Sequence, residues 1–173
     1  MPDRRLILVL LVLAAGAGGA TASGVLEGGG GGAADDAPSG AAGRVVKVVD
    51  GDTIHVQLAG TREKVRYIGV DTPETKHPTK GVECYGQKAS DFNAALVAGE
   101  QVRLVRDVEE RDRYGRLLAY VYRVRDGLFV NAELARLGYA QPLSIPPDVR
   151  HADRFAELAG QAREQGRGLW SAC

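Results

Sequence analysis

Polar and apolar residues alternate over several short stretches of the chain, and this pattern predicts β-strands. Residues 53–58 alternate strictly, with Ile54, Val56 and Leu58 on one face, which is the period of two expected of a half-buried strand. Similar runs predict strands at 44–49, 64–70, 102–108 and 117–124, with a short one at 128–130. Asp50-Gly51 and Ala59-Gly60 supply turn residues between the first three strands, so a meander is expected.

Three other stretches repeat their apolar residues at the spacing of an amphipathic helix. Residues 85–98 place Ala89, Phe92 and Leu96 on one face, and the other two stretches lie at about 131–137 and about 148–165. Five main strands arriving as a meander, with three helices, favour an α+β fold. A small antiparallel barrel fits this order better than a doubly wound parallel sheet.

The first 43 residues carry neither pattern. Arg4 and Arg5 precede an apolar run at 6–15 and small residues at 20–22, which predicts a signal peptide at 1–22 and export to the periplasm or the medium. The apolar run is short for a membrane span of about 20 residues, so no stable span is expected after processing. An uncleaved N-terminal segment that tethers the protein to the membrane is the alternative.

The amino-acid composition changes near residue 43, and this change divides the rest of the chain into a tether and one domain. Residues 23–43 are rich in Gly and Ala and predict a flexible tether, which leaves one domain at 44–173. The chain has 22 Lys and Arg against 22 Asp and Glu, and the domain has 20 basic and 18 acidic side chains. The near-zero net charge therefore gives no sign of the broadly basic surface that is usual in nucleic-acid binders, and an anionic substrate is expected to bind at a local site.

Candidate chemistry lies in and beside the turns, at Asp50-Gly51-Asp52-Thr53, at Arg66, at Asp71-Thr72-Pro73-Glu74 and at Asp112-Arg113-Tyr114-Gly115-Arg116. Each element alone has an ordinary explanation. Asp-Gly is a common hairpin turn, Asp-Thr-Pro-Glu a common turn or helix start, and an arginine in a strand is often a paired structural charge. Residues 71–83 form a long connection without periodicity, however, and such loops are often functional.

Taken together and in this order, the motifs resemble the staphylococcal nuclease family of calcium-dependent thermonucleases. The resemblance extends from Arg44 to Ser171. It is carried by residues 49–53, 70–78, 80–83, 85–86, 89–90, 112, 114–116, 118–120 and 169–171. It implies a five-stranded barrel of the oligonucleotide-binding (OB-fold) type with three helices. It also implies a monomeric calcium-dependent endonuclease that hydrolyses DNA and RNA, breaks the bond to the 5′ oxygen and leaves 3′-phosphate ends.

The resemblance assigns a role to individual residues. Asp52 and Asp71 stand where the family supplies carboxylates to Ca²⁺, and Thr72 stands where it supplies a backbone carbonyl. Such a hard cation takes six to eight oxygen ligands, so waters and a substrate phosphate would complete its shell. Catalytic roles fall on Arg66 and Arg116, as clamps on the scissile phosphate, and on Glu74, as general base. Substrate contacts are expected at Lys80, Arg113 and Tyr114.

Two features depart from the family. Residues 143–147 read Leu-Ser-Ile-Pro-Pro, where the type member of the family has tyrosines near the nucleotide. Little stacking surface is left, so binding is expected to depend on phosphate contacts and to weaken steeply with salt. Cys84 and Cys173 form a disulfide if the protein is exported, and two free thiols are the alternative.

The three histidines do not suggest a zinc site, because His55, His77 and His151 lack zinc-ligand spacing.

Two rival interpretations come from other classes of protein. A barrel of this fold can bind nucleic acid or protein without cutting it, but such a barrel is expected to lack the acids and arginines of the motifs. A calcium-binding surface protein that depends mainly on its tether is the second rival. Digestion of nucleic acid by the purified protein separates the enzyme from both.

Overall fold

The computed structural model describes residues 39–75 and 81–173. The predicted signal peptide, most of the predicted tether and Lys80 therefore lie outside the described residues. Within these two ranges, none of the helices is long and apolar enough to cross a membrane.

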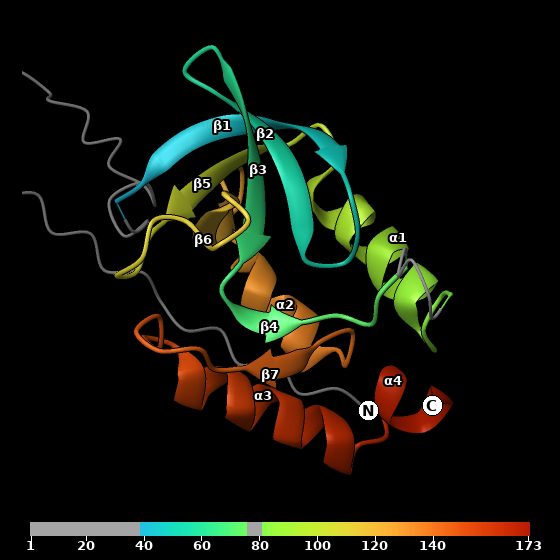
Figure 1. The fold of residues 1–173 in the computed structure, drawn as a ribbon. Coiled ribbons are helices and arrows are strands. Elements are labelled where there is room, and N and C mark those ends of the chain that lie inside the picture. Colours follow the sequence, from blue (N-terminus) through green and yellow to red (C-terminus); the bar gives the residue numbers. More distant parts are fainter. Residues whose placement is uncertain (1–38, 76–80) are drawn as a thin grey trace, which may run out of the picture. The chain divides into compact units, whose positions relative to one another are not determined.

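Five strands close into a barrel in the order β1, β2, β3, β6, β5 (Figure 1). Their bounds are Ala41–Val48 (β1), Thr53–Leu58 (β2), Thr61–Tyr67 (β3), Gln101–Val105 (β5) and Leu117–Arg123 (β6). The predicted five-stranded α+β barrel is confirmed. The expectation of purely antiparallel pairing is wrong at one seam, because β3 and β6 run parallel. β1 begins three residues before Arg44, so the last residues of the predicted tether pair with β5.

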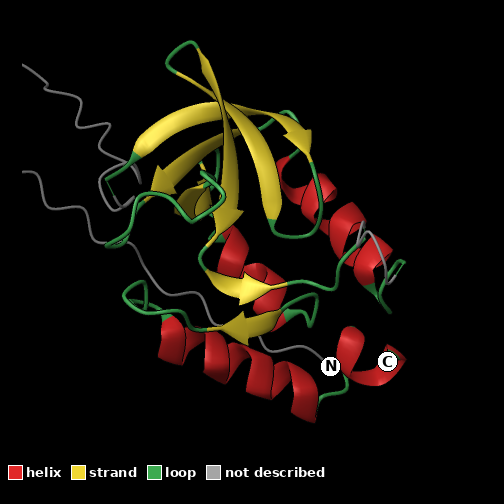
Figure 2. Ribbon diagram, viewed as in Figure 1, coloured by secondary structure: helices red, strands yellow, loops and turns green. Residues whose placement is uncertain are grey.

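The remaining elements lie below the barrel and along its right side in Figure 2. They are the strands β4 (Gly69–Asp71) and β7 (Gln141–Leu143) and the helices α1 (Gly86–Val97), α2 (Val130–Arg136), α3 (Ala152–Glu164) and α4 (Leu169–Ala172). The three predicted helices are present, while β7 and α4 were not predicted. Residues 128–130 do not form the predicted strand, since Phe129 makes only an isolated bridge to Tyr122 before α2 begins.

The predicted strand at 64–70 is two strands, and Gly69 is the reason. Gly69 has a φ of +81°, a conformation that other residues rarely adopt, and a Cβ atom there would collide with the ring of Phe155 on α3. The chain therefore leaves the barrel after β3, and β4 pairs with β7 in a separate two-stranded sheet. This break brings Asp71 and the loop after it to the end of the barrel.

Two buried asparagines fasten helices to this end of the barrel. Asn131 on α2 accepts a hydrogen bond from the Val121 amide and donates one to the Ile68 carbonyl, both at 2.9 Å. Asn93 on α1 accepts from the Tyr67 hydroxyl at 3.0 Å and donates to the Asp50 carbonyl at 2.9 Å. Both side chains are fully buried, so these bonds tie the β1–β2 turn and the β3–β4 break to the helical layer.

Candidate active site

The β1–β2 turn places two carboxylates beside the β4 segment. Gly51 lies so close to Thr72 that a Cβ atom at this position would stand 2.6 Å from the Thr72 hydroxyl. A residue without a side chain is needed for that approach. Asp52 is consequently only 5% exposed, and one of its oxygens accepts hydrogen bonds from the Thr72 amide at 2.8 Å and the Thr72 hydroxyl at 3.0 Å.

Arg66 bridges two of the predicted calcium ligands. Its Nε lies 3.1 Å from Asp52, and a terminal nitrogen lies 2.7 Å from Asp71. The other terminal nitrogen donates to the carbonyls of Tyr67 at 2.6 Å and Val70 at 2.7 Å. A guanidinium has five N–H groups, so this arrangement leaves one of them for a further acceptor.

Arg116 is held differently, by an anchor at its Nε. Asp112 accepts the Arg116 Nε–H at 2.6 Å and, through its other oxygen, the amides of Tyr114 and Arg116 at 2.9 Å. Burial acts to raise the pKa of Asp112, but the hydrogen bonds from Arg116 and from the Tyr114 amide, together with the charge of Arg116, outweigh burial and lower the pKa. Among the described residues, the terminal nitrogens of Arg116 have no hydrogen-bond or ion-pair partner, so they remain available to an anion.

These groups line one polar cavity of about 280 Å³. Its lining comprises Asp50, Asp52, Thr53, Arg66, Asp71, Thr72, Glu74, Arg116 and Leu143. The structure thus brings together the six residues for which catalytic or calcium-binding roles are predicted. Because four of the lining residues are carboxylic acids and two are arginines, the cavity combines groups that attract a cation with groups that attract a phosphate.

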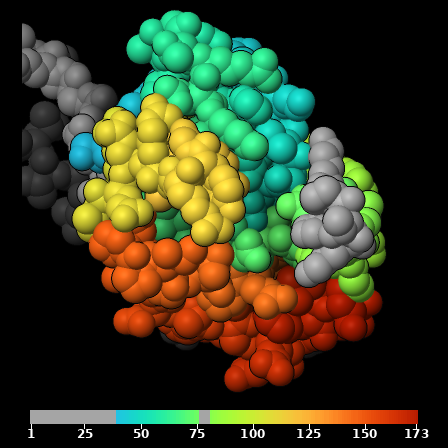
Figure 3. Space-filling model, in the orientation of Figure 1, coloured from blue at the N-terminus to red at the C-terminus, as the bar shows by residue number. Residues whose placement is uncertain are grey.

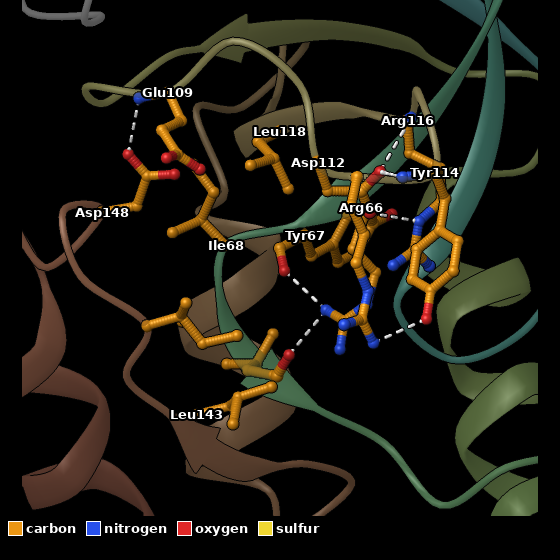
Figure 4. A pocket seen from close by; sticks show the side chains of 14 residues that line it. Arg66, Tyr67, Ile68, Glu109, Asp112, Tyr114, Arg116, Leu118, Leu143 and Asp148 are labelled. Atoms are coloured by element: carbon orange, nitrogen blue, oxygen red, sulfur yellow. Dashed lines mark hydrogen bonds and ion pairs between the residues drawn. The ribbon is translucent and has the colours of Figure 1, made fainter.

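A larger and more apolar groove of about 440 Å³ adjoins the cavity, and both share Arg66, Arg116 and Leu143. Figure 4 shows Arg66, Asp112 and Arg116 beside the apolar Ile68, Leu118 and Leu143. Arg113 and the exposed Tyr114 line this groove and contact each other at 2.7 Å. Lys80 lies outside the described residues, so its place relative to the groove is not described.

The loop that carries Asp112 and Arg116 is fastened to the segment that follows β7. Asp148, which is 6% exposed, accepts the amides of Val108 and Glu109 at 2.9 Å. In Figure 3 the yellow loop and the orange segment lie next to each other on the surface. Asp148 therefore helps to fix one wall of the groove.

Asp50 is a residue of the cavity that belongs to a candidate motif but to which the sequence assigned no role. It lies in the same turn as Asp52, and burial together with the negative charge of Asp52 raises its pKa to about 6. The Asp50-Gly51 pair fits an ordinary hairpin turn, so its carboxylate carried no separate signal. Its clearest sequence signal is its position two residues before a predicted calcium ligand.

Glu74 is held through its backbone by Glu83, at the far end of the same loop. The Glu74 amide donates to the Glu83 carboxylate at 3.0 Å, and the Glu83 amide donates to the Glu74 carbonyl at 2.8 Å. The next residue, Cys84, forms a disulfide with Cys173. The base of the loop is therefore linked covalently to the C-terminus, next to the residue that holds Glu74.

We expect Glu83→Ala to lower kcat by about threefold to tenfold, because a lost hydrogen bond of roughly 1 kcal/mol leaves Glu74 less well positioned. Glu83→Gln keeps a carbonyl oxygen that can accept the Glu74 amide and should recover most of the activity. Steady-state kinetics on DNA measure both variants, with the exposed Glu164→Ala on α3 as control. Equal losses in the alanine and glutamine variants would contradict positioning by this hydrogen bond.

A closed five-stranded barrel with arginines and carboxylates at one cavity defines an OB-type protein equipped to bind phosphate esters. Residues 64–172 match the family described as staphylococcal nuclease homologue, and the chain belongs to that family.

Relatives with known names agree with this assignment. The chain is 40% identical over 128 residues to a thermonuclease of Staphylococcus hyicus, covering 74% of this chain and 75% of that protein. Identity is also 40% to a thermonuclease of Staphylococcus intermedius, covering 73% and 74%. Endonuclease YncB of Bacillus subtilis (strain 168) is 40% identical as well, covering 72% of this chain and 59% of that protein. The chain is therefore a thermonuclease-like nuclease, a hydrolase with a nucleic-acid substrate.

Proposed function

We propose that the protein is a calcium-dependent endonuclease that hydrolyses DNA and RNA, breaks the bond to the 5′ oxygen and leaves 3′-phosphate ends. The observation that carries this proposal is the convergence of Arg66, Arg116, Glu74 and the aspartates on one cavity. The signal-like N-terminus supports export, and we propose that the exported protein acts as a monomer. No membrane-spanning helix is found in residues 39–75 and 81–173.

The donor set of the cavity fits a hard cation, although no group of three or more His, Cys, Asp or Glu in the described ranges has the arrangement of a metal site. Carboxylates of Asp52 and Asp71 and a carbonyl of Thr72 are the oxygen ligands that Ca²⁺ prefers. Burial raises the pKa of Asp50, and the negative charge of Asp52 raises it further; a cation in the cavity would offset the repulsion between these two carboxylates. When bound, Ca²⁺ would supply positive charge and acidify a coordinated water.

The side chains divide the remaining work. Arg116, anchored through Nε, presents its free fork to the phosphate oxygens, where negative charge accumulates as the ester is cleaved. Arg66 adds a second positive charge close by and keeps Asp52 and Asp71 in place. Glu74 orients or deprotonates the attacking water. Each of these residues lines the cavity.

The groove next to the cavity receives the nucleotide that adjoins the scissile phosphate. Its lining includes Tyr114 and the aliphatic Leu143 and Ile145. Aliphatic side chains stack weakly on bases compared with tyrosine, so the groove supports low base preference. Affinity then rests on phosphate contacts and is expected to fall steeply with salt.

Purified protein incubated with single-stranded DNA, double-stranded DNA and RNA tests the proposal. Parallel reactions contain calcium, magnesium or a chelator, and the ends of the products are analysed. Cleavage with calcium, little with magnesium and none with chelator, together with 3′-phosphate ends, is the expected result. If polynucleotides stayed intact in calcium, the protein would be a binding module and not an enzyme. Products with 5′-phosphate ends would show that the bond to the 3′ oxygen is the one that breaks.

A further inference from the structure

A row of cations crosses the outer face of the barrel and ends at the catalytic cavity. Arg62, Lys64 and Arg66 alternate along β3, so their side chains lie on the same face of that strand. Arg66 is the residue that reaches Asp52 and Asp71 in the cavity. Arg62 and Lys64 continue the same line away from the cavity, and both are exposed.

Neighbouring strands widen this row. His55 on β2 lies opposite both Lys64 on β3 and Lys47 on β1. Gln57 in turn lies opposite both Arg62 and Arg44. Directly opposite residues share a face of the sheet, so four cations occupy two adjacent cross-strand rows. We call this surface the basic track and define it as Arg44, Lys47, Arg62 and Lys64.

The positive charges of the track reinforce one another. Burial lowers the pKa of His55, and the charges of Arg62, Lys47 and Lys64 lower it further, so three cations act at one point of the surface. Glu63, between Arg62 and Lys64 in sequence, faces the other way and bonds to Arg111 at 2.9 Å. Within the described ranges, none of the four track residues forms an ion pair.

We propose that the basic track binds the phosphodiester backbone of the substrate as it leaves the cavity, an inference that rests on the proposed nuclease function. Charge complementarity and continuity with Arg66 favour nucleic acid over other polyanions. Arg62 lies about 13 Å along β3 from Arg66 at about 3.3 Å per residue, which corresponds to roughly four base pairs at 3.4 Å each. The track thus lets a nearly neutral domain hold a long substrate.

The double variant Arg62→Gln/Lys64→Gln tests the track. Arg154→Gln/Arg163→Gln is the matched control, since it removes two exposed arginines from α3, at the opposite end of the domain from the β2–β3 hairpin in Figure 1. The readout is the ratio of kcat/KM on a DNA strand of about 30 nucleotides to kcat/KM on a dinucleotide, which is too short to reach the track. Thermal unfolding of all proteins verifies that they are folded.

We expect the track variant to lower this ratio roughly fivefold, while the control leaves it unchanged. The slope of log affinity for non-cleaved DNA against log salt should fall by about 1.4 for single strands and about 1.8 for duplex. Equal ratios in the track variant, the control and the wild type would overturn the track. The proposal would also be overturned if the track variant bound and cleaved DNA as the wild type does and lost only its binding to anionic lipid vesicles. Failure of the wild type to cleave any substrate would instead overturn the proposed function.

Discussion

Arg116→Ala is expected to lower kcat by about 10²- to 10³-fold, which is the usual cost of removing one preorganised stabiliser of transition-state charge. Arg116 is the arginine of the cavity whose terminal nitrogens have no partner among the described residues, so its charge is available to the phosphate. Asp112 holds the guanidinium through Nε, and the free fork therefore needs little reorganisation to meet the substrate. Single-turnover and steady-state kinetics in saturating calcium measure the effect.

A second arginine of the same loop serves as the control. Arg106 is 51% exposed and pairs with Glu110, so Arg106→Ala should stay within about threefold of wild type because an exposed ion pair contributes little. Turnover of Arg116→Ala within threefold of wild type would remove Arg116 from the catalytic residues. A rise in KM alone would reassign it to uniform substrate binding.

Among the strands of the barrel, β2 shows why periodicity could predict a strand, because its apolar residues recur with a period of two and two of the three are buried. β2 has the predicted bounds, since Ile54 and Val56 are fully buried and His55 and Gln57 are not. The break between β3 and β4 was not predictable from periodicity, because it depends on the contact between Gly69 and Phe155, which are 86 positions apart in the chain. β7 escaped prediction because all three of its residues are exposed and show no alternation.

The positions of the candidate site residues in the chain were predicted from ordered motifs, whereas their contacts were not. The sequence pattern of a carboxylate after a turn glycine is the same whether the side chain faces solvent or, like that of Asp52, is buried against Thr72. Asp50 and Glu83 were missed as site residues for a related reason. The role of each depends on a partner that the fold brings close. The partner of Asp50 is Asp52, and the partner of Glu83 is the backbone of Glu74.

Asp50→Asn is expected to raise the free energy of unfolding at pH 7 by about 2 to 3 kcal/mol. Burial and the charge of Asp52 raise the pKa of Asp50 to about 6 in the folded protein, against 3.8 ordinarily, and each pKa unit corresponds to about 1.4 kcal/mol. Because the folded pKa is the higher one, the penalty for ionising Asp50 in the folded protein grows from about pH 3.8 upward and is complete above about pH 6. That penalty disappears as the pH falls toward 3.8.

Urea unfolding in chelator at pH 7, 5 and 4 measures the difference between variant and wild type, with the exposed Asp91→Asn on α1 as control. The gain should shrink as the pH falls, since the wild-type carboxyl then takes up its own proton. The Asp50→Asn variant retains a side-chain oxygen that can accept the Asp52 amide, which lies 3.1 Å from the Asp50 carboxylate, so little packing is lost. If the gain in the free energy of unfolding stayed constant with pH, packing rather than charge would be its cause. If there were no gain at pH 7, the turn would tolerate the charges of both Asp50 and Asp52. A pH-dependent gain would mean that this cavity keeps a destabilising carboxylate beside Asp52, as expected where a site is shaped for a cation at a cost in stability.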